Sequence, residues 1–236
     1  MCGAYGYSGK GEKELYDRFE VVNTLESFSP RYITHIGTMN PVIYMTADGV
    51  QIKNMYWSFI PSWAREKRLK FSTFNARSDR VMESKVYKPA LPSQRAIIPA
   101  THFYEPDKVH YTKPPHPWYY FGLKTKGIFG LAGLYNVWTD PKTGEKLYTY
   151  TIMTTDPNEE VGEYHPREPA LLKDRKVEKD WINPDITEPE QALALLEPYP
   201  PGELEFWRAP DTAKNPRIDS PEVIQPVEEV VQTPLL

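Results

Sequence analysis

Prolines interrupt this chain along most of its length and limit the secondary structure that it can form. The sequence has 24 prolines in 236 residues, about twice the average proline share of proteins. Because proline has no backbone N–H and breaks helix interiors, we expect many loops, no long uninterrupted helix, and an extended or irregular end beyond Pro210. The 16 tyrosines and 6 tryptophans favour strands.

Strand-forming runs separated by turn residues account for most of the predicted structure. They cover residues 31–36, 42–45, 50–59, 95–98, 118–123, 128–137 and 146–154. Short helices are predicted at 11–19, at 81–86 behind a Ser78 cap, behind an Asp156 cap, and behind a capping box formed by Thr187 and Glu190. The pattern indicates one α+β domain with a mostly antiparallel sheet, not a doubly wound parallel one.

Charge is distributed unevenly along a chain whose net charge is −4. Residues 65–88 contain eight basic and three acidic side chains, whereas residues 178–205 contain eight acidic and one basic. A local basic patch can bind phosphate on an acidic protein because salt screens distant charges. A solvated charged face explains the same pattern.

The cysteine content and the start of the chain bear on the compartment. The only cysteine is Cys2, so an internal disulfide is excluded, as is typical of a reducing compartment. No apolar run near the start is typical of a signal peptide or a membrane span. We therefore expect a cytoplasmic protein without membrane contact.

Cys2 directly follows the initiator methionine, and this position is the strongest chemical signal in the sequence. Removal of Met1 would give Cys2 a free α-amine beside its thiol, with reference pKa values of about 7.7–8.0 and about 8.5. A 1,2-aminothiol condenses with an aldehyde to a five-membered thiazolidine, and the ring closure is intramolecular. The opened deoxyribose of an abasic site supplies such an aldehyde. The alternatives are an accidental Met-Cys start and an N-terminal nucleophile hydrolase.

Three further segments carry polar side chains that suit catalysis. Asn75 precedes Arg77 at the predicted mouth of a helix, where the pair could orient a carbonyl and hold a phosphate. Glu105 directly follows a strand in an apolar and aromatic segment, where burial would raise its pKa and suit it to general acid–base work. His165 lies two residues before Arg167 on a proline-stiffened loop. Each also has a purely structural interpretation. Asn75 could be a turn residue, Glu105 a partner of a surface lysine, and His165 an ordinary loop residue.

Segments distributed over nearly the whole chain match one family in order. They are Met1-Cys2-Gly3, Pro30-Arg31-Tyr32, Trp57 with Ile60-Pro61-Ser62-Trp63, Asn75-Ala76-Arg77-Ser78, Ile98-Pro99-Ala100 with Phe103-Tyr104-Glu105, Ala132-Gly133-Leu134-Tyr135, Thr151-Ile152-Met153-Thr154-Thr155, and His165 with Arg167 and Pro169. On these segments the chain resembles the SRAP (SOS response-associated peptidase) family of abasic-site processing proteins. The resemblance implies a single α+β domain at 1–226 with a barrel-like, mostly antiparallel core and short peripheral helices, followed by a C-terminal tail at 227–236.

The resemblance also implies a mechanism and its residues. The protein would remove its own Met1 and then join Cys2, the nucleophile, to abasic sites in single-stranded DNA as a thiazolidine crosslink. Glu105 would act as acid and base, Asn75 would position the N-terminal group, and His165 would assist opening of the sugar ring. The family resemblance favours a monomer. No cofactor is implied, and five scattered histidines with one cysteine show no metal-ligand spacing.

Contacts with DNA are the part of the implied function where the sequence departs most from the family. Arg77 and Arg167 match phosphate contacts, which would make binding salt-dependent and independent of sequence. Ala4 stands where the family usually has arginine, Pro106 where tryptophan is common, and Glu168 where methionine is common. We therefore expect the DNA-facing surface of this chain to differ from the one usual in the family.

Three functional hypotheses follow. The leading one is an abasic-site crosslinking enzyme that processes its own N-terminus. The second is a cysteine-dependent peptidase or amidase that acts in trans with the same Cys2, Asn75 and Glu105. The third is a DNA-binding module without catalysis, which would use the basic stretch 65–88. In either DNA-binding hypothesis, aromatic residues such as Trp57, Trp63 and Tyr104 could stack on bases, although core packing is their more common use.

Overall fold

Five strands of the protein close into a barrel. The computed structural model describes residues 3–227. The barrel strands are β3 (Met39–Thr46), β4 (Gly49–Trp57), β6 (Arg95–Ala100), β9 (Phe129–Thr139) and β10 (Lys146–Thr155). Antiparallel pairs run from β4 through β3, β6 and β9 to β10, and a parallel pair between β10 and β4 closes the ring. Three short strands extend it: β5 (Asn75–Arg77) and β11 (Glu168–Pro169) pair with β10, and β12 (Leu171–Leu172) pairs with β9.

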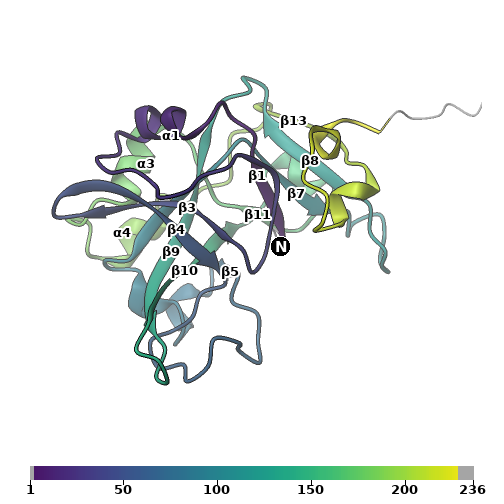
Figure 1. Cartoon of the computed structure of the whole chain (residues 1–236). Helices are drawn as coiled ribbons and strands as arrows, with labels where there is room; N and C mark the ends of the chain where they lie inside the picture. Colours follow the sequence, from purple (N-terminus) through teal and green to yellow (C-terminus); the bar gives the residue numbers. More distant parts are fainter. Residues whose placement is uncertain (1–2, 228–236) are drawn as a thin grey trace, which may run out of the picture.

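A second, antiparallel sheet of five strands packs against the barrel. Its strands, in order across the sheet, are β13 (Leu204–Arg208), β8 (Trp118–Leu123), β7 (His102–Pro106), β1 (Ala4–Tyr7) and β2 (Arg31–His35). In Figure 1, β1, β7, β8 and β13 lie to the right of the labelled barrel strands. Tyr5 and Phe103 from this sheet share one buried cluster with Trp57 and Tyr150 of the barrel. This apolar contact joins the two sheets into one unit.

Strand register determines which side chains share one face of the barrel. Ile43 is opposite Ile52 on one side and opposite Ile97 on the other, and all three side chains are buried. Gly133 permits the close approach of neighbouring strands, because a Cβ at this position would lie 2.2 Å from the Ile98 side chain. Arg95 is also buried. Its guanidinium donates hydrogen bonds to the carbonyl oxygens of Leu91, Pro92, Trp181 and Asn183.

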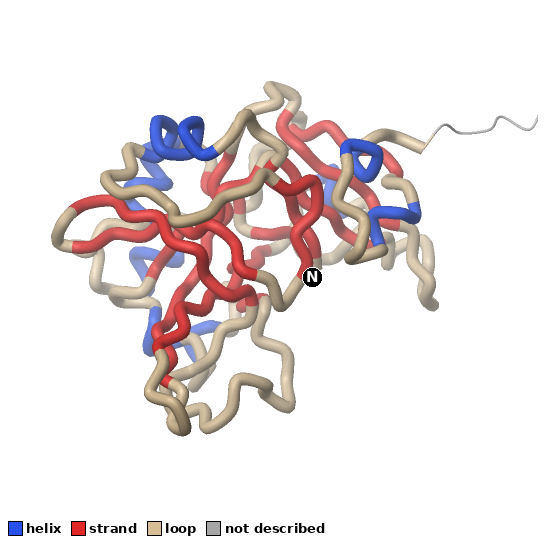
Figure 2. The backbone as a smooth tube through the Cα atoms, viewed as in Figure 1, coloured by secondary structure: helices blue, strands red, loops and turns tan. Residues whose placement is uncertain are grey.

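The helices are short and peripheral (Figure 2). They are α1 (Glu12–Phe19), α2 (Glu159–Gly162), α3 (Arg175–Trp181) and α4 (Pro189–Leu193), together with the 3-10 turns η1 (Val81–Glu83), η2 (Lys88–Ala90), η3 (Asp211–Lys214) and η4 (Pro221–Ile224). Arg18 of α1 binds Glu178 of α3 through both of its Nη atoms, at 2.8 and 2.9 Å. Glu178 also accepts the Gly130 N–H at 3.0 Å, so one buried carboxylate ties two helices to β9.

The α+β fold with a barrel-like, mostly antiparallel core is confirmed, and each predicted strand lies within or overlaps an observed one. Three helix predictions were wrong in detail. Residues 81–83 form only a 3-10 turn, and Ser78 instead donates its N–H to the Thr154 carbonyl. Asn158, not Asp156, caps α2, and no side chain caps α4, which follows Glu188. Asp156 binds Arg167 instead of capping a helix. Thr187 lies one residue before the N-cap of α4.

The aromatic residues suggested for base stacking have different environments. Trp57 and Tyr104 are 0% and 1% exposed, and they pack within the core, so their stacking on DNA was a wrong prediction. Trp63 is 58% exposed and stays available. No helix within residues 3–227 has the length and apolar character needed to cross a membrane.

Candidate active site

Glu105 is a completely buried carboxyl group near the end of β7. Its side chain is 0% exposed, and β7 pairs with β1 so that Ala4 lies opposite the preceding residue, Tyr104. Burial raises the pKa of Glu105, the charge of Glu168 adds a smaller increase, and nearby positive charges such as Lys108 lower it, so that the net value is about 7. A carboxyl group with this pKa can both donate and accept a proton near neutral pH. The prediction that burial would raise its pKa is confirmed.

His165 lies directly beside Glu105, although the two residues are 60 positions apart in the sequence. Its Nδ1 is 3.5 Å from Oε2 of Glu105 and 2.7 Å from the carbonyl oxygen of Arg167. Nδ1 also lies 3.2 Å from the Arg167 N–H, but a carbonyl oxygen can only accept, so the shorter contact assigns a proton to Nδ1 and leaves Nε2 unprotonated. Burial lowers the pKa of His165 to about 3. The imidazole is therefore neutral at physiological pH, and its contact with Glu105 is not an ion pair.

Backbone contacts bring the His165 loop to the strand that carries Glu105. The Tyr164 carbonyl accepts the N–H of Lys108 at 2.8 Å, just beyond β7. The Tyr164 ring stacks on Tyr119 of β8 with ring centres 3.8 Å apart. The His165 N–H donates to the Val161 carbonyl at the end of α2, at 2.8 Å. These contacts hold the imidazole in place before any substrate is bound.

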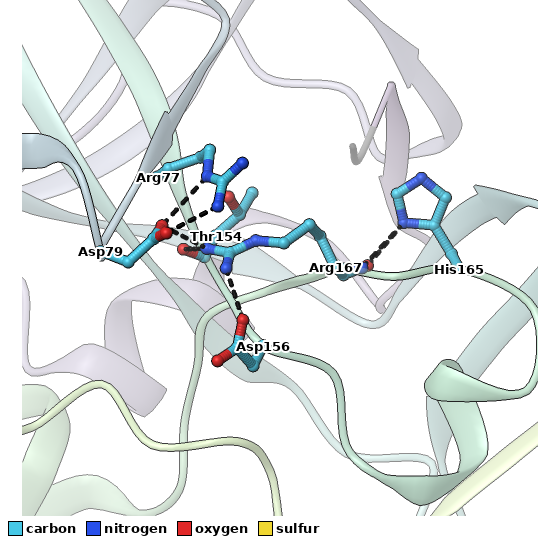
Figure 3. A network of polar contacts seen from close by, with 6 residues as sticks. All are labelled: Arg77, Asp79, Thr154, Asp156, His165 and Arg167. Carbon is cyan, nitrogen blue, oxygen red and sulfur yellow. Dashed lines mark hydrogen bonds and ion pairs between the residues drawn. The ribbon is translucent and has the colours of Figure 1, made fainter.

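Arg77 and Arg167 belong to one network of charged groups, shown in Figure 3. Arg77 donates from Nε and Nη2 to the two oxygens of Asp79, at 3.0 and 2.6 Å. Arg167 donates from Nη1 to Asp156 at 2.7 Å and from Nη2 to the Thr154 carbonyl at 2.5 Å. Its Nη2 also lies 3.4 Å from Asp79. Asp79 is therefore shared by both arginines.

Asn75 reaches the same region through β5. This strand runs parallel to β10, with Asn75 opposite Ile152 and Arg77 opposite Thr154. The predicted helix mouth at this point was wrong, because Asn75 lies on a strand. Its carbonyl accepts the Tyr87 hydroxyl at 3.1 Å. Asn75 and Arg77 line a pocket of about 260 Å³ together with Ser72, Phe74, Arg80, Val81, Ser84 and Tyr87.

The structure thus connects the predicted side chains of the described residues through a series of contacts. Glu105 contacts His165, Arg167 follows His165 on the same loop, and Asp79 joins Arg167 to Arg77 on the strand that begins with Asn75. Cys2 lies outside the described residues. Within residues 3–227, no group of three or more His, Cys, Asp or Glu side chains could hold a metal ion.

The sequence predicted no role in the site for three of its carboxylates. Glu168 is 0% exposed and accepts the N–H groups of Asn158 and Tyr199 at 3.0 and 2.9 Å. Asp79 and Asp156 neutralise the two arginines. Glu168 directly precedes the apolar run Pro169–Leu172. This position is a usable signal, since a buried strand seldom begins with an unpaired acid.

Comparison with known families identifies the family of the chain. The family model described as SOS response associated peptidase (SRAP) matches residues 1–216. The chain belongs to the SRAP family. The match spans both sheets and every described residue of the site, so the site geometry lies within the part of the chain that defines the family.

Two named relatives and one solved structure are similar to most of the chain. The chain is 32% identical over 230 residues to the abasic site processing protein YoqW of Bacillus subtilis (strain 168), covering 95% of this chain and 99% of YoqW. It is 29% identical over 211 residues to the abasic site processing protein HMCES of Pongo abelii, covering 78% and 59%. A crystal structure from Bacteroides thetaiotaomicron has the same fold, with a TM-score of 0.81 over 96% of this chain and all of that chain, at 24% identity.

Proposed function

We propose that this SRAP protein processes abasic sites in single-stranded DNA by forming a covalent crosslink through Cys2 after removing its own Met1. The observation that carries the proposal is a buried carboxyl group of near-neutral pKa, Glu105, in contact with a neutral imidazole, His165, beside the start of β1. The names of the relatives, abasic site processing proteins, supply the substrate class.

Chain connectivity limits how far Cys2 can lie from the start of β1. Ala4, the first residue of β1, lies opposite Tyr104, the neighbour of Glu105. Consecutive Cα atoms are about 3.8 Å apart, so the Cα of Cys2 lies within about 7.6 Å of that of Ala4 in any conformation. The proposal requires the N-terminal amine and thiol to reach Glu105 from this position.

The proposed reaction needs several proton transfers. The amine of Cys2 attacks the aldehyde carbon, and the resulting carbinolamine loses its hydroxyl as water to give an imine. The thiol then adds to the imine carbon, its proton passes to the nitrogen, and the thiazolidine closes. Glu105 in its protonated form donates the proton that departs with the water, and as carboxylate it accepts the proton of an attacking group. His165, neutral and unprotonated at Nε2, accepts a hydrogen bond from the sugar hydroxyl and so assists the opening of the ring.

The same carboxyl group suits removal of Met1. Peptide hydrolysis also needs a proton donor for the departing amine and a base for the attacking group, and near-neutral pKa supports both roles. Asn75, on β5, would orient the N-terminal group. Arg77 and Arg167 would hold DNA phosphates, which predicts binding that weakens as salt rises.

The test uses a single-stranded oligonucleotide with one abasic site, incubated with the protein and run on a denaturing gel. The native protein should give a shifted band, and Cys2→Ala should give none. Glu105→Gln should slow crosslinking by about a hundredfold or more, whereas Glu163→Gln, an exposed acid near the same loop, should react like the native protein. Intact mass should show that Met1 is absent.

One control makes the outcome decisive. Each variant should also be produced from a cleavable leader that leaves residue 2 as the first residue, so that failed Met1 removal is not mistaken for failed crosslinking. If native protein with a free Cys2 gives no shifted band, the crosslinking proposal is wrong. Cleavage of peptides by the same preparation would then favour a peptidase that acts in trans.

A further inference from the structure

The two arginines of the site and their two aspartate partners form a network with no net charge. Arg77 and Arg167 supply two positive charges, and Asp79 and Asp156 supply two negative ones. The hydrogen bond from Arg77 is the first cause that lowers the pKa of Asp79, so this carboxylate is ionised at neutral pH. A phosphate that approaches the network therefore meets arginines that are already neutralised.

We propose that Asp79 occupies the phosphate-binding position of Arg77, so that a DNA phosphate must displace it and Asp79 limits the affinity of the protein for single strands. This inference rests on the proposed function, because it concerns the DNA that the site would bind. It assigns an affinity-setting role to a residue that would otherwise be counted only as a structural partner.

The geometry is that of an arginine holding an oxyanion. Arg77 presents Nε and Nη2 to the two oxygens of Asp79, at 3.0 and 2.6 Å, the side-on fork with which arginine also binds phosphate. The same carboxylate lies 3.4 Å from Nη2 of Arg167. It is located between both guanidinium groups, as Figure 3 shows, where one phosphate group could contact both.

The exposure of each side chain indicates which arginine would exchange its partner. The side chains of Arg77 and Asp79 are 39% and 45% exposed, and ion pairs this exposed contribute little net free energy. Arg167 is only 9% exposed and is also held by the Thr154 carbonyl. Arg77 therefore exchanges Asp79 for the phosphate, while Arg167 keeps its present contacts.

The affinity change expected from removing the carboxylate follows from counterion release. One additional phosphate contact to a single strand changes the slope of log K against log salt by about −0.7. For proteins that bind equally well at about 1 M salt, this slope corresponds to about fivefold tighter binding at 0.1 M salt. Asp79→Asn should therefore bind single-stranded DNA about fivefold more tightly and with a steeper salt dependence. The gain should come through Arg77.

The experiment measures binding of a fluorescently labelled oligothymidine by anisotropy between 0.05 and 0.3 M salt, in a Cys2→Ala background that excludes covalent trapping. The variants are Asp79→Asn, Arg77→Gln and the double variant. Asp156→Asn is the matched control, since it removes an equal charge from the other end of the network. Asp79→Ser replaces Asp79→Asn if the latter melts at a lower temperature than the native protein.

The expected result has two parts. Asp79→Asn tightens binding more than Asp156→Asn does, and Arg77→Gln costs more affinity in the Asp79→Asn background than in the native one. Equal costs in both backgrounds, or equal gains from both aspartate variants, would show that Asp79 acts only as a general charge and would overturn the inference. Weaker binding by Asp79→Asn would also overturn it, because Asp79 would then be orienting Arg77 for phosphate.

These outcomes separate the inference from the proposed function. If the native protein binds and crosslinks DNA but Asp79→Asn shows no gain, only the inference fails. If binding appears only after Asp79 is replaced, the inference is supported. If neither protein binds single-stranded DNA, both proposals fail together.

Discussion

Replacing Glu168 by glutamine should change how the stability of the protein depends on pH. Glu168 is 0% exposed, and each of its carboxylate oxygens accepts one backbone N–H, from Asn158 at the cap of α2 and from Tyr199. Burial raises its pKa to about 7, although the two hydrogen bonds act in the opposite direction. The loop between Asn158 and Glu168 carries His165, so this carboxyl group supports the site.

The sign of the effect follows from linkage. The folded state binds the Glu168 proton more tightly than the unfolded state, whose pKa is near 4.5. The stabilisation is complete below that value and is lost as pH rises through about 7. For these two pKa values the loss between pH 5 and pH 8 is about 2.5 kcal/mol. Glutamine cannot ionise, so the variant lacks this loss, but its amide faces one backbone N–H, which costs about 1–3 kcal/mol at every pH.

Urea unfolding of both proteins at pH 5, 6, 7 and 8 measures the difference. Glu168→Gln should be less stable than the native protein at pH 5, and the gap should close by about 2–3 kcal/mol by pH 8. The crosslinking rate offers a second readout. Because the charge of Glu168 raises the pKa of Glu105, the variant should shift the corresponding limb of the pH–rate profile to lower pH. Stability curves that stay parallel from pH 5 to pH 8 would refute the reasoning.

Three substitutions elsewhere test the packing that supports the site, each by urea unfolding. Arg95→Met removes the donor that serves four carbonyl oxygens, two of them in fully buried hydrogen bonds, and should cost about 3–5 kcal/mol; a loss below 1 kcal/mol would contradict this. Tyr150→Phe removes a hydroxyl that contacts Tyr5 at 2.7 Å and should cost about 1–2 kcal/mol, with no change expected in the fold by circular dichroism. Gly133→Ala places a Cβ 2.2 Å from Ile98 and should cost about 1–3 kcal/mol; a stabilised variant would show that the barrel has room there.

Strands with several alternating or β-branched residues could be predicted from the sequence, and short ones could not. The runs that became β8 and β10 were located to within a residue, because each carries its own pattern. The strands β1, β5 and β7 were missed, since segments of three to five residues do not establish a period. They form strands because the neighbouring strand supplies hydrogen bonds, which is a property of the assembled sheet.

Helix caps show the same limit. Asp156 is a good capping residue in sequence terms, yet its carboxylate binds Arg167 at 2.7 Å, and Asn158 caps α2 instead. A side chain with two possible partners takes the one that the tertiary fold brings close. Local propensity therefore located the helix to within two residues but chose the wrong cap.

For the site, the sequence by itself determined the residue types and their motifs, including Glu105, His165 and Arg167. Only the tertiary structure decided that Glu105 contacts His165 and that Asp79 neutralises the arginine predicted to bind phosphate. The physical reason is that the chemistry of a side chain is encoded at its own position, whereas its pKa and its partners depend on burial and on strand register across the barrel. Both are set by segments far apart in the chain.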